Sequence, residues 1–387
     1  MTPERPWEVP APEPASAPRP SLVGLDRTAL ASLVQSLGEP AWRGDQLFEG
    51  IYRQRWTGWD QFSAFGKDLR ARLQDCAVLA RPEIVESSAS ADGSTKHAFR
   101  LADGLLIEGV HMPYLPRGRT ARDTATPDRV TLCLSSQVGC AMGCTFCATG
   151  QMGIRRNLVP SEIVGQVLAM LDHHSHSRDR PVNLVFMGMG EPMHNLDHLL
   201  AAFRVLTDPG GLASPPRRIT VSTVGLVSGI QRLGAVRPRP RLAVSLNATT
   251  DAARSRIMPV NRVWGLDELA AALGSFPLER GERITLEFVL LKGVTDTPED
   301  GRRLVEFARR FPSKVNLIPF NPHDSAAGSE DLKDGAGFTP PDEARVEALC
   351  AQLAKAGVTV SVRRSRGQDV AGACGQLVRG RSLRGGR

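Results

Sequence analysis

The sequence contains no uninterrupted apolar run long enough to span a bilayer, and its N-terminus lacks the charged-then-apolar pattern of a secretory signal. We therefore expect a soluble, cytoplasmic protein with no membrane partner. Cysteine is also scarce, with seven residues in 387, an odd number of which three are clustered. This usage argues against a framework of structural disulfides and favours metal or redox chemistry in a reducing compartment.

Acidic residues are nearly absent from two stretches. Residues 217–256 hold eight arginines and one acidic residue, Asp251, and residues 363–387 hold seven arginines and only Asp369. If these arginines share one face, they suit a polyanion, because phosphate contacts supply affinity that is independent of sequence. A solvated basic surface is the competing interpretation, and the net charge of +7 does not separate the two.

The first third of the chain divides by composition. Residues 1–20 hold seven prolines and predict a disordered leader. Residues 21–82 carry helical apolar periodicity and predict a small helical accessory domain. Residues 83–129 predict short strands separated by Asp-Gly turns, followed by an exposed basic loop over residues 113–129.

From Val130 the chain alternates between strand and helix patterns, with Ser161 placed to cap the first helix. This alternation predicts an α/β fold with parallel strands and outer helices: a partial (βα)6 barrel over residues 130–363, followed by a cysteine loop and basic tail over residues 364–387. The expected strands are residues 130–134, 182–187, 218–222, 241–246, 284–290 and 314–320, and the expected helices lie near residues 161–171, 196–206, 226–233, 266–273, 298–311 and 342–356.

Five of the six expected strands end in a polar or glycine-rich cluster. Ligand sites of parallel α/β barrels collect at the carboxyl ends of the strands, so these clusters predict one shared site. Glycines allow close approach of a ligand, a carboxylate accepts hydrogen bonds from an ammonium group, and serine and asparagine bind carboxylates or hydroxyls. Taken singly, each is equally an ordinary turn or cap residue. The candidates are Gly188, Gly190, Glu191, Ser222, Ser245, Asn247 and Asn321.

The three clustered thiols are Cys140, Cys144 and Cys147, spaced as CxxxCxxC. An iron–sulfur cluster normally takes four thiolates, so three leave one iron open. The spacing resembles the radical S-adenosylmethionine (radical-SAM) superfamily, in which that iron binds the amino and carboxylate groups of SAM. The competing interpretation is a zinc knuckle completed by His173, His174 or Cys133.

Further motifs resemble the RlmN/Cfr family of radical-SAM RNA methyltransferases over nearly the whole chain, from about Arg27 to Val378. The matching segments are residues 133–140, the three-cysteine loop, and residues 156–158, 188–192 and 373–377. The resemblance implies a partial barrel, a [4Fe–4S] cluster on the three clustered cysteines, and SAM as both radical source and methyl donor. The implied SAM contacts are Gly190, Glu191, Ser222, Ser245, Leu246, Asn247 and Asn321.

The resemblance also implies a covalent mechanism that uses two SAM molecules. Cys374 takes a methyl group from one SAM, and a radical derived from the second removes hydrogen from that methyl group. The resulting carbon radical adds to adenine, Glu108 removes the ring proton, and Cys133 attacks the sulfur of Cys374 to release the product. The Cys133–Cys374 disulfide is transient, as suits the cytosol. Independently of the resemblance, the sequence shows only that Cys374 lies in a loop of small residues. Judged by its pattern alone, Glu108 is a carboxylate on a strand.

The implied target is C2 of an adenine in 23S ribosomal RNA at the peptidyl-transferase centre, with tRNA as a second candidate and a small flavoprotein as electron donor. A Cfr-like reaction at C8, which confers antibiotic resistance, uses the same catalytic residues. Residues 155–158 resemble the C2 branch more closely. Two departures from the family are a longer segment over residues 114–129 and Asn247, where some members carry histidine. A non-catalytic zinc or iron–sulfur protein that binds RNA is the alternative from a different class.

Overall fold

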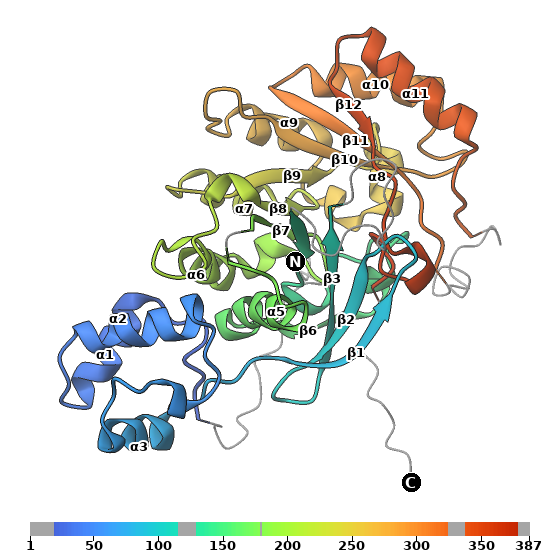
Figure 1. Ribbon diagram of the computed structural model, residues 1–387. Helices are drawn as coiled ribbons and strands as arrows, with labels where there is room; N and C mark the ends of the chain where they lie inside the picture. Colours follow the sequence, from blue (N-terminus) through green and yellow to red (C-terminus); the bar gives the residue numbers. More distant parts are fainter. Residues whose placement is uncertain (1–18, 115–128, 179, 324–336, 378–387) are drawn as a thin grey trace, which may run out of the picture.

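The structure, a computed structural model, describes residues 19–114, 129–178, 180–323 and 337–377 (Figure 1). Most of the predicted leader, of the predicted exposed loop and of the basic tail lies outside these ranges. Within them, no helix is both long enough and apolar enough to cross a membrane.

Ten strands form the main sheet, in the order β1-β2-β3-β4-β7-β8-β9-β10-β11-β12. The strands from β4 onward run parallel, while β1, β2 and β3 extend one edge in antiparallel fashion. This open sheet agrees with the predicted partial barrel, and all six expected strands are present. The bounds are β1 Glu83–Ala89, β2 Thr95–Arg100, β3 Leu106–Pro113, β4 Val130–Cys133, β7 Val182–Phe186, β8 Ile219–Thr223, β9 Arg241–Ser245, β10 Ile284–Leu290, β11 Ser313–Pro319 and β12 Val360–Val362.

Helices connect the parallel strands, as the alternation predicted (Figure 1). Their apolar faces pack against strands that are themselves mostly buried, which is typical of a parallel sheet. The sequence did not predict α8, whose seven residues are too few to show a periodic pattern. The bounds are α5 Pro160–His173, α6 Leu196–Thr207, α7 Val227–Gly234, α8 Asp251–Ile257, α9 Leu266–Gly274, α10 Pro298–Ala308 and α11 Glu343–Lys355.

The prediction that Ser161 caps the first barrel helix is wrong. Helix α5 begins at Pro160, and its N-cap is Val159. Proline suits the first helical position, because the N–H that it lacks would have no partner within the helix there. The Glu162 carboxylate accepts a hydrogen bond from the Val159 N–H at 3.0 Å. The helix therefore starts two residues before the position that its sequence pattern suggested.

The N-terminal helices lie to one side of the sheet (Figure 1). They are α1 Arg27–Ser36, α2 Trp42–Phe48, which runs on into a π-helical turn over Glu49–Arg53, and α3 Lys67–Cys76. The buried Tyr52 hydroxyl accepts a hydrogen bond from the Gly24 N–H at 2.8 Å and lies 2.8 Å from the Leu25 carbonyl oxygen.

A separate two-stranded hairpin brackets the cysteine loop. It consists of β5 Gln137–Cys140 and β6 Gly153–Asn157, with the short helix α4 Ala148–Gln151 between them. Gly139 has a φ of +79°, and a Cβ there would lie 2.0 Å from the Gly153 carbonyl oxygen. Only glycine fits this position, so the hairpin that presents the first thiol depends on it.

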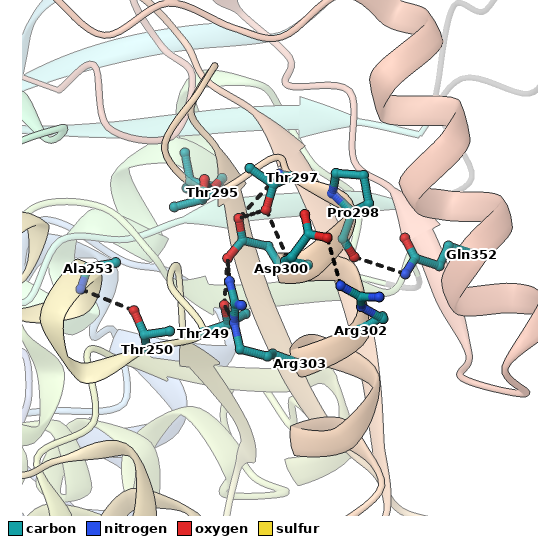
Figure 2. Close-up of polar contacts among 12 residues, drawn as sticks. Thr249, Thr250, Ala253, Thr295, Thr297, Pro298, Asp300, Arg302, Arg303 and Gln352 are labelled. Atoms are coloured by element: carbon teal, nitrogen blue, oxygen red, sulfur yellow. Dashed lines mark hydrogen bonds and ion pairs between the residues drawn. The ribbon is translucent and has the colours of Figure 1, made fainter.

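A polar network fastens the loop after β9 to the start of α10 (Figure 2). Thr297 caps α10 by accepting a hydrogen bond from the Asp300 N–H at 3.1 Å. The Asp300 carboxylate accepts hydrogen bonds from the Thr249 hydroxyl at 2.6 Å and from Arg303 at 2.7 Å. Thr249, in the loop that follows residues 245–247, is thereby held against the start of α10.

Candidate active site

A cavity opens at the carboxyl ends of the parallel strands, where the sequence predicted the site. Its walls come from the cysteine loop, from β10 and the ends of β7, β8, β9 and β11, and from a loop near the C-terminus. Eleven of the predicted residues line it: Cys140, Cys144, Cys147, Gly188, Gly190, Glu191, Ser222, Ser245, Asn247, Asn321 and Cys374.

The three thiols that line the cavity suit an iron–sulfur cluster, because thiolates are its usual ligands and three of them leave one iron open. Burial raises the pKa of the Cys140 and Cys144 thiols, so a bound cation is needed to keep them as thiolates.

The proposed completing ligands of a zinc knuckle do not line the cavity. His173 and His174 lie beside His97 of β2, at the end of α5, and Cys133 lies on β4.

Glu191 is a buried carboxylate in the cavity wall. It accepts hydrogen bonds from the backbone N–H groups of Met193 at 3.0 Å and Val224 at 2.8 Å. Burial raises the pKa of Glu191 to about 7, and the bonds from Val224, Thr223 and Met193 oppose the rise. These two N–H groups fix the carboxylate at the cavity wall, where it can still accept a hydrogen bond from a ligand cation.

The glycines and polar residues at the strand ends have mixed roles. Gly190 has a φ of +99°, and a Cβ there would clash with Gln137. Close packing against Gln137 therefore explains why this residue is glycine. Asn247 also has a positive φ, and its side-chain oxygen accepts the Val289 N–H at 3.0 Å. Ser222 and Ser245 line the cavity, whereas Leu246 is fully buried and does not reach it.

Asn321 holds the loop that carries Cys374. Its amide group donates to the Cys374 carbonyl and to the Ser365 hydroxyl, both at 2.9 Å, and its oxygen accepts from Gln368 at 2.7 Å. The Gly375 carbonyl also accepts a hydrogen bond from the Ala148 N–H, directly after the cysteine loop, at 2.8 Å. These bonds bring a thiol from the end of the chain to the wall of the cavity.

Cys133 and Cys374 are near enough to interact electrostatically, and both are free thiols in this structure. Burial raises the pKa of Cys133 to about 12, with a further contribution from Cys374, whereas the Arg363 charge opposes the rise. Arg363 lines the cavity, and the charge of Cys374 raises its pKa. The Arg363 guanidinium therefore favours the thiolate form of Cys133, and the sequence did not single out Arg363 for this role.

Glu108, on β3, is not among the residues that line the cavity. Its neighbour two positions on, Val110, pairs with Cys133 across the antiparallel β3–β4 ladder, so the Glu108 and Cys133 side chains share one face of the sheet. Lys96 lies 3.3 Å from the Glu108 carboxylate and 3.4 Å from the carbonyl of Ala371. Lys96 therefore connects Glu108 to the loop of Cys374.

Sequence patterns did not reveal two further charged residues, one in the cavity wall and one bonded to the strand ends that form it. Glu287 lines the cavity from the middle of β10, and its Oε2 accepts no hydrogen bond within the described part of the chain. Arg254 of α8 is fully buried and donates to the carbonyl oxygens of Leu246, Ser245 and Val224. Glu287 lies in the middle of its strand and Arg254 is buried, and neither property can be recognised without the fold.

Burial also corrects the hypothesis that the arginines of residues 217–256 form one polyanion-binding face. Arg254 has no exposed surface. Arg239 is 6% exposed and forms an ion pair with Glu282, at 2.6 Å. Arg232 forms an ion pair with Asp197. At least Arg239 and Arg254 are therefore structural.

An open parallel barrel with a three-thiol loop at the carboxyl ends of its strands defines a radical-SAM fold. The model of the Radical SAM superfamily matches residues 134–308, and that of the ribosomal RNA large subunit methyltransferase N-terminal domain matches residues 21–79. The solved structure of a radical SAM methyltransferase from Sphaerobacter thermophilus is similar, with a TM-score of 0.83 and 38% identity, covering 92% of this chain and 99% of that one.

Curated relatives match almost end to end. The chain is 44% identical to the dual-specificity RNA methyltransferase RlmN 2 of Myxococcus xanthus, over 95% of this chain and 93% of the relative. It is 43% identical to the dual-specificity RNA methyltransferase RlmN of Syntrophobacter fumaroxidans, over 90% of this chain and 95% of the relative. The chain belongs to the RlmN family of radical-SAM RNA methyltransferases.

Proposed function

We propose that this protein methylates C2 of an adenine in 23S ribosomal RNA, at the peptidyl-transferase centre, and of an adenine in tRNA. The observation that carries the proposal is the position of Cys374, which lines the same cavity as Cys140, Cys144 and Cys147. The names of the relatives, dual-specificity RNA methyltransferases, support two RNA substrates.

Each residue then has a distinct task. A [4Fe–4S] cluster on the three thiolates, together with SAM, supplies the methyl group and the radical chemistry. Cys374 carries the methyl group to the adenine ring, and its loop is held in place by Asn321. Glu108 accepts the ring proton, and Cys133 attacks the sulfur of Cys374 to release the methylated base. A small flavoprotein is the proposed electron source.

The cavity offers suitable partners for SAM. Glu191 is placed to accept the ammonium group, and Ser222 and Ser245 can bind its carboxylate or hydroxyls. The unpartnered Oε2 of Glu287 is a further acceptor in the cavity wall. An acceptor buried without a hydrogen bond is costly, and a bound ligand that donates to it removes that cost.

The proposal is tested by anaerobic incubation of the full chain with SAM, a reductant, and fragments of 23S ribosomal RNA and tRNA. We expect nucleoside analysis by mass spectrometry to show adenosine methylated at C2. Methylation only at C8 would replace this assignment with the Cfr-like reaction. Protein that is isolated without oxygen and holds zinc but no iron would instead indicate a non-catalytic RNA-binding protein.

The raised pKa of Glu191 predicts that SAM binding depends on pH. Below a pKa of about 7 the carboxylate is protonated and cannot attract an ammonium group. The affinity for SAM should therefore fall by roughly 15-fold between pH 7 and pH 5.5, because the ionised fraction falls from about one half to about 0.03. Isothermal titration calorimetry measures this dependence. Glu191→Gln should bind weakly with no such slope, and an unchanged slope in that variant would assign the titration to another group.

Replacing Asn321 with alanine should release the loop of Cys374. We expect methylation to fall by roughly 100-fold, because small displacements of a reacting group are costly. Alkylation of Cys374 by iodoacetamide, followed by peptide mass spectrometry, should become faster. If the main role of Asn321 is instead to bind SAM, the Kd for SAM will rise and the alkylation rate will stay the same.

A further inference from the structure

Three histidines form a compact group away from the cavity, where β2 meets the end of α5. His97 lies on β2 and is fully buried, His173 is the last residue of α5, and His174 is its C-cap. One nitrogen of each ring lies within 4.8 Å of the others. In the part of the chain that the structure describes, no other group of histidine, cysteine or acidic donors converges in this way.

We propose that His97, His173 and His174 bind a divalent transition-metal ion such as Zn²⁺, which fastens β2 to the end of α5. This site is independent of the iron–sulfur cluster and of the methyl transfer reaction. Its role is structural, since the ion would hold β2 in place. Strand β2 pairs in turn with β3, which carries Glu108. Three imidazoles are an established donor set for zinc, with the fourth position left to water.

The arrangement of the rings supports the proposal. Their centroids lie 4.9 Å, 5.0 Å and 5.1 Å apart, and the interplanar angles are 72°, 69° and 70°. These values describe a nearly three-fold arrangement. A zinc ion about 2.0–2.1 Å from one nitrogen of each ring, in tetrahedral geometry, places the ring centroids roughly 5 Å apart. The exposed side chain of His173 leaves the ion a path from solvent.

Neighbouring groups orient two of the rings. The Nδ1 atom of His97 lies 2.8 Å from the Ser87 hydroxyl, and its Nε2 lies 2.9 Å from Nε2 of His174. An oxygen partner on the second nitrogen commonly fixes the tautomer of a metal-binding histidine. His111 stacks on His174 with 3.6 Å between centroids.

One electrostatic feature also favours a cation here. The C-terminal end of a helix carries partial negative charge, and α5 ends at His173.

Cobalt binding tests the proposal. The full chain, with its cluster and without a polyhistidine tag, is titrated with Co²⁺. We expect one Co²⁺ per chain, with the visible absorption of a tetrahedral nitrogen-bound ion and no sulfur-to-cobalt charge-transfer band, and we expect Zn²⁺ to displace it. A sulfur charge-transfer band alone would place the ion at the cysteines and overturn the proposal.

Variants make the assignment specific. His173 is exposed, so His173→Ala should keep the fold, as checked by circular dichroism, and should weaken Co²⁺ binding by roughly 100-fold or more, because even loss of a hydrogen bond to a ligand costs 10–100-fold. Ser87→Ala should weaken it by roughly tenfold. His198 lies on α6, and His198→Ala is the matched control. This variant should bind Co²⁺ with the affinity of the unaltered protein. Equal affinity in His173→Ala and His198→Ala would contradict the proposal.

Discussion

Cys374→Ala is expected to abolish RNA methylation while the iron content of the protein stays unchanged. The variant keeps all three cluster thiols but has no sulfur to carry the methyl group across the cavity. Loss of a residue that forms a covalent intermediate removes the reaction path itself, so activity should fall on the order of 10³-fold or more. Methylated nucleoside formed per iron, under single-turnover conditions with saturating SAM, is the measurement.

A matched control separates this effect from general damage. Cys350→Ala, on α11, removes a partly buried thiol that lies outside the cavity and should retain full activity. Cys133→Ala should stop the reaction later, after the carbon bond to adenine has formed, and so leave RNA covalently attached to Cys374. Methylation by Cys374→Ala at the rate of the unaltered protein would disprove the covalent route.

Arg254→Met is expected to destabilise the protein more than any other single change outside the cluster ligands. The guanidinium is fully buried and donates to three backbone carbonyls at the ends of β8 and β9 and to the Asn261 side chain. Methionine fills the space but leaves these acceptors unpaired. A buried acceptor that is left without a partner costs about 1–3 kcal/mol of the free energy of unfolding.

The same substitution should also reduce iron occupancy. The positive charge of Arg254 attracts the thiolate of Cys144, and the carbonyls that it binds belong to the strand ends that line the cavity. Thermal unfolding followed by circular dichroism, together with iron analysis, checks both effects. Arg256→Met is the control, since Arg256 is exposed on the same helix and its loss should change stability by less than about 0.5 kcal/mol. Similar unfolding curves for the two variants would show that the buried network contributes little.

Local patterns were sufficient for the architecture. Strands and helices of a parallel barrel repeat with periods that hydrophobic residues reveal, and the polar clusters at strand ends follow from the direction of the chain. The three-cysteine spacing is local as well, because one short loop supplies all three thiols. The start of α5 was misplaced by two residues, because a serine near a helix start is a common cap but a proline at the first position makes it unnecessary.

The amino-acid sequence by itself determined the strand–helix order, the thiol loop and the rim on which ligand-binding residues gather. Only the tertiary structure decided that Arg254 is buried, that Glu287 lines the cavity from the middle of its strand, and that His97 lies beside His173 and His174. These outcomes depend on contacts between segments far apart in the chain. A residue type and its neighbours carry no record of such contacts, because burial and electrostatic environment are created only when the sheet brings the segments together.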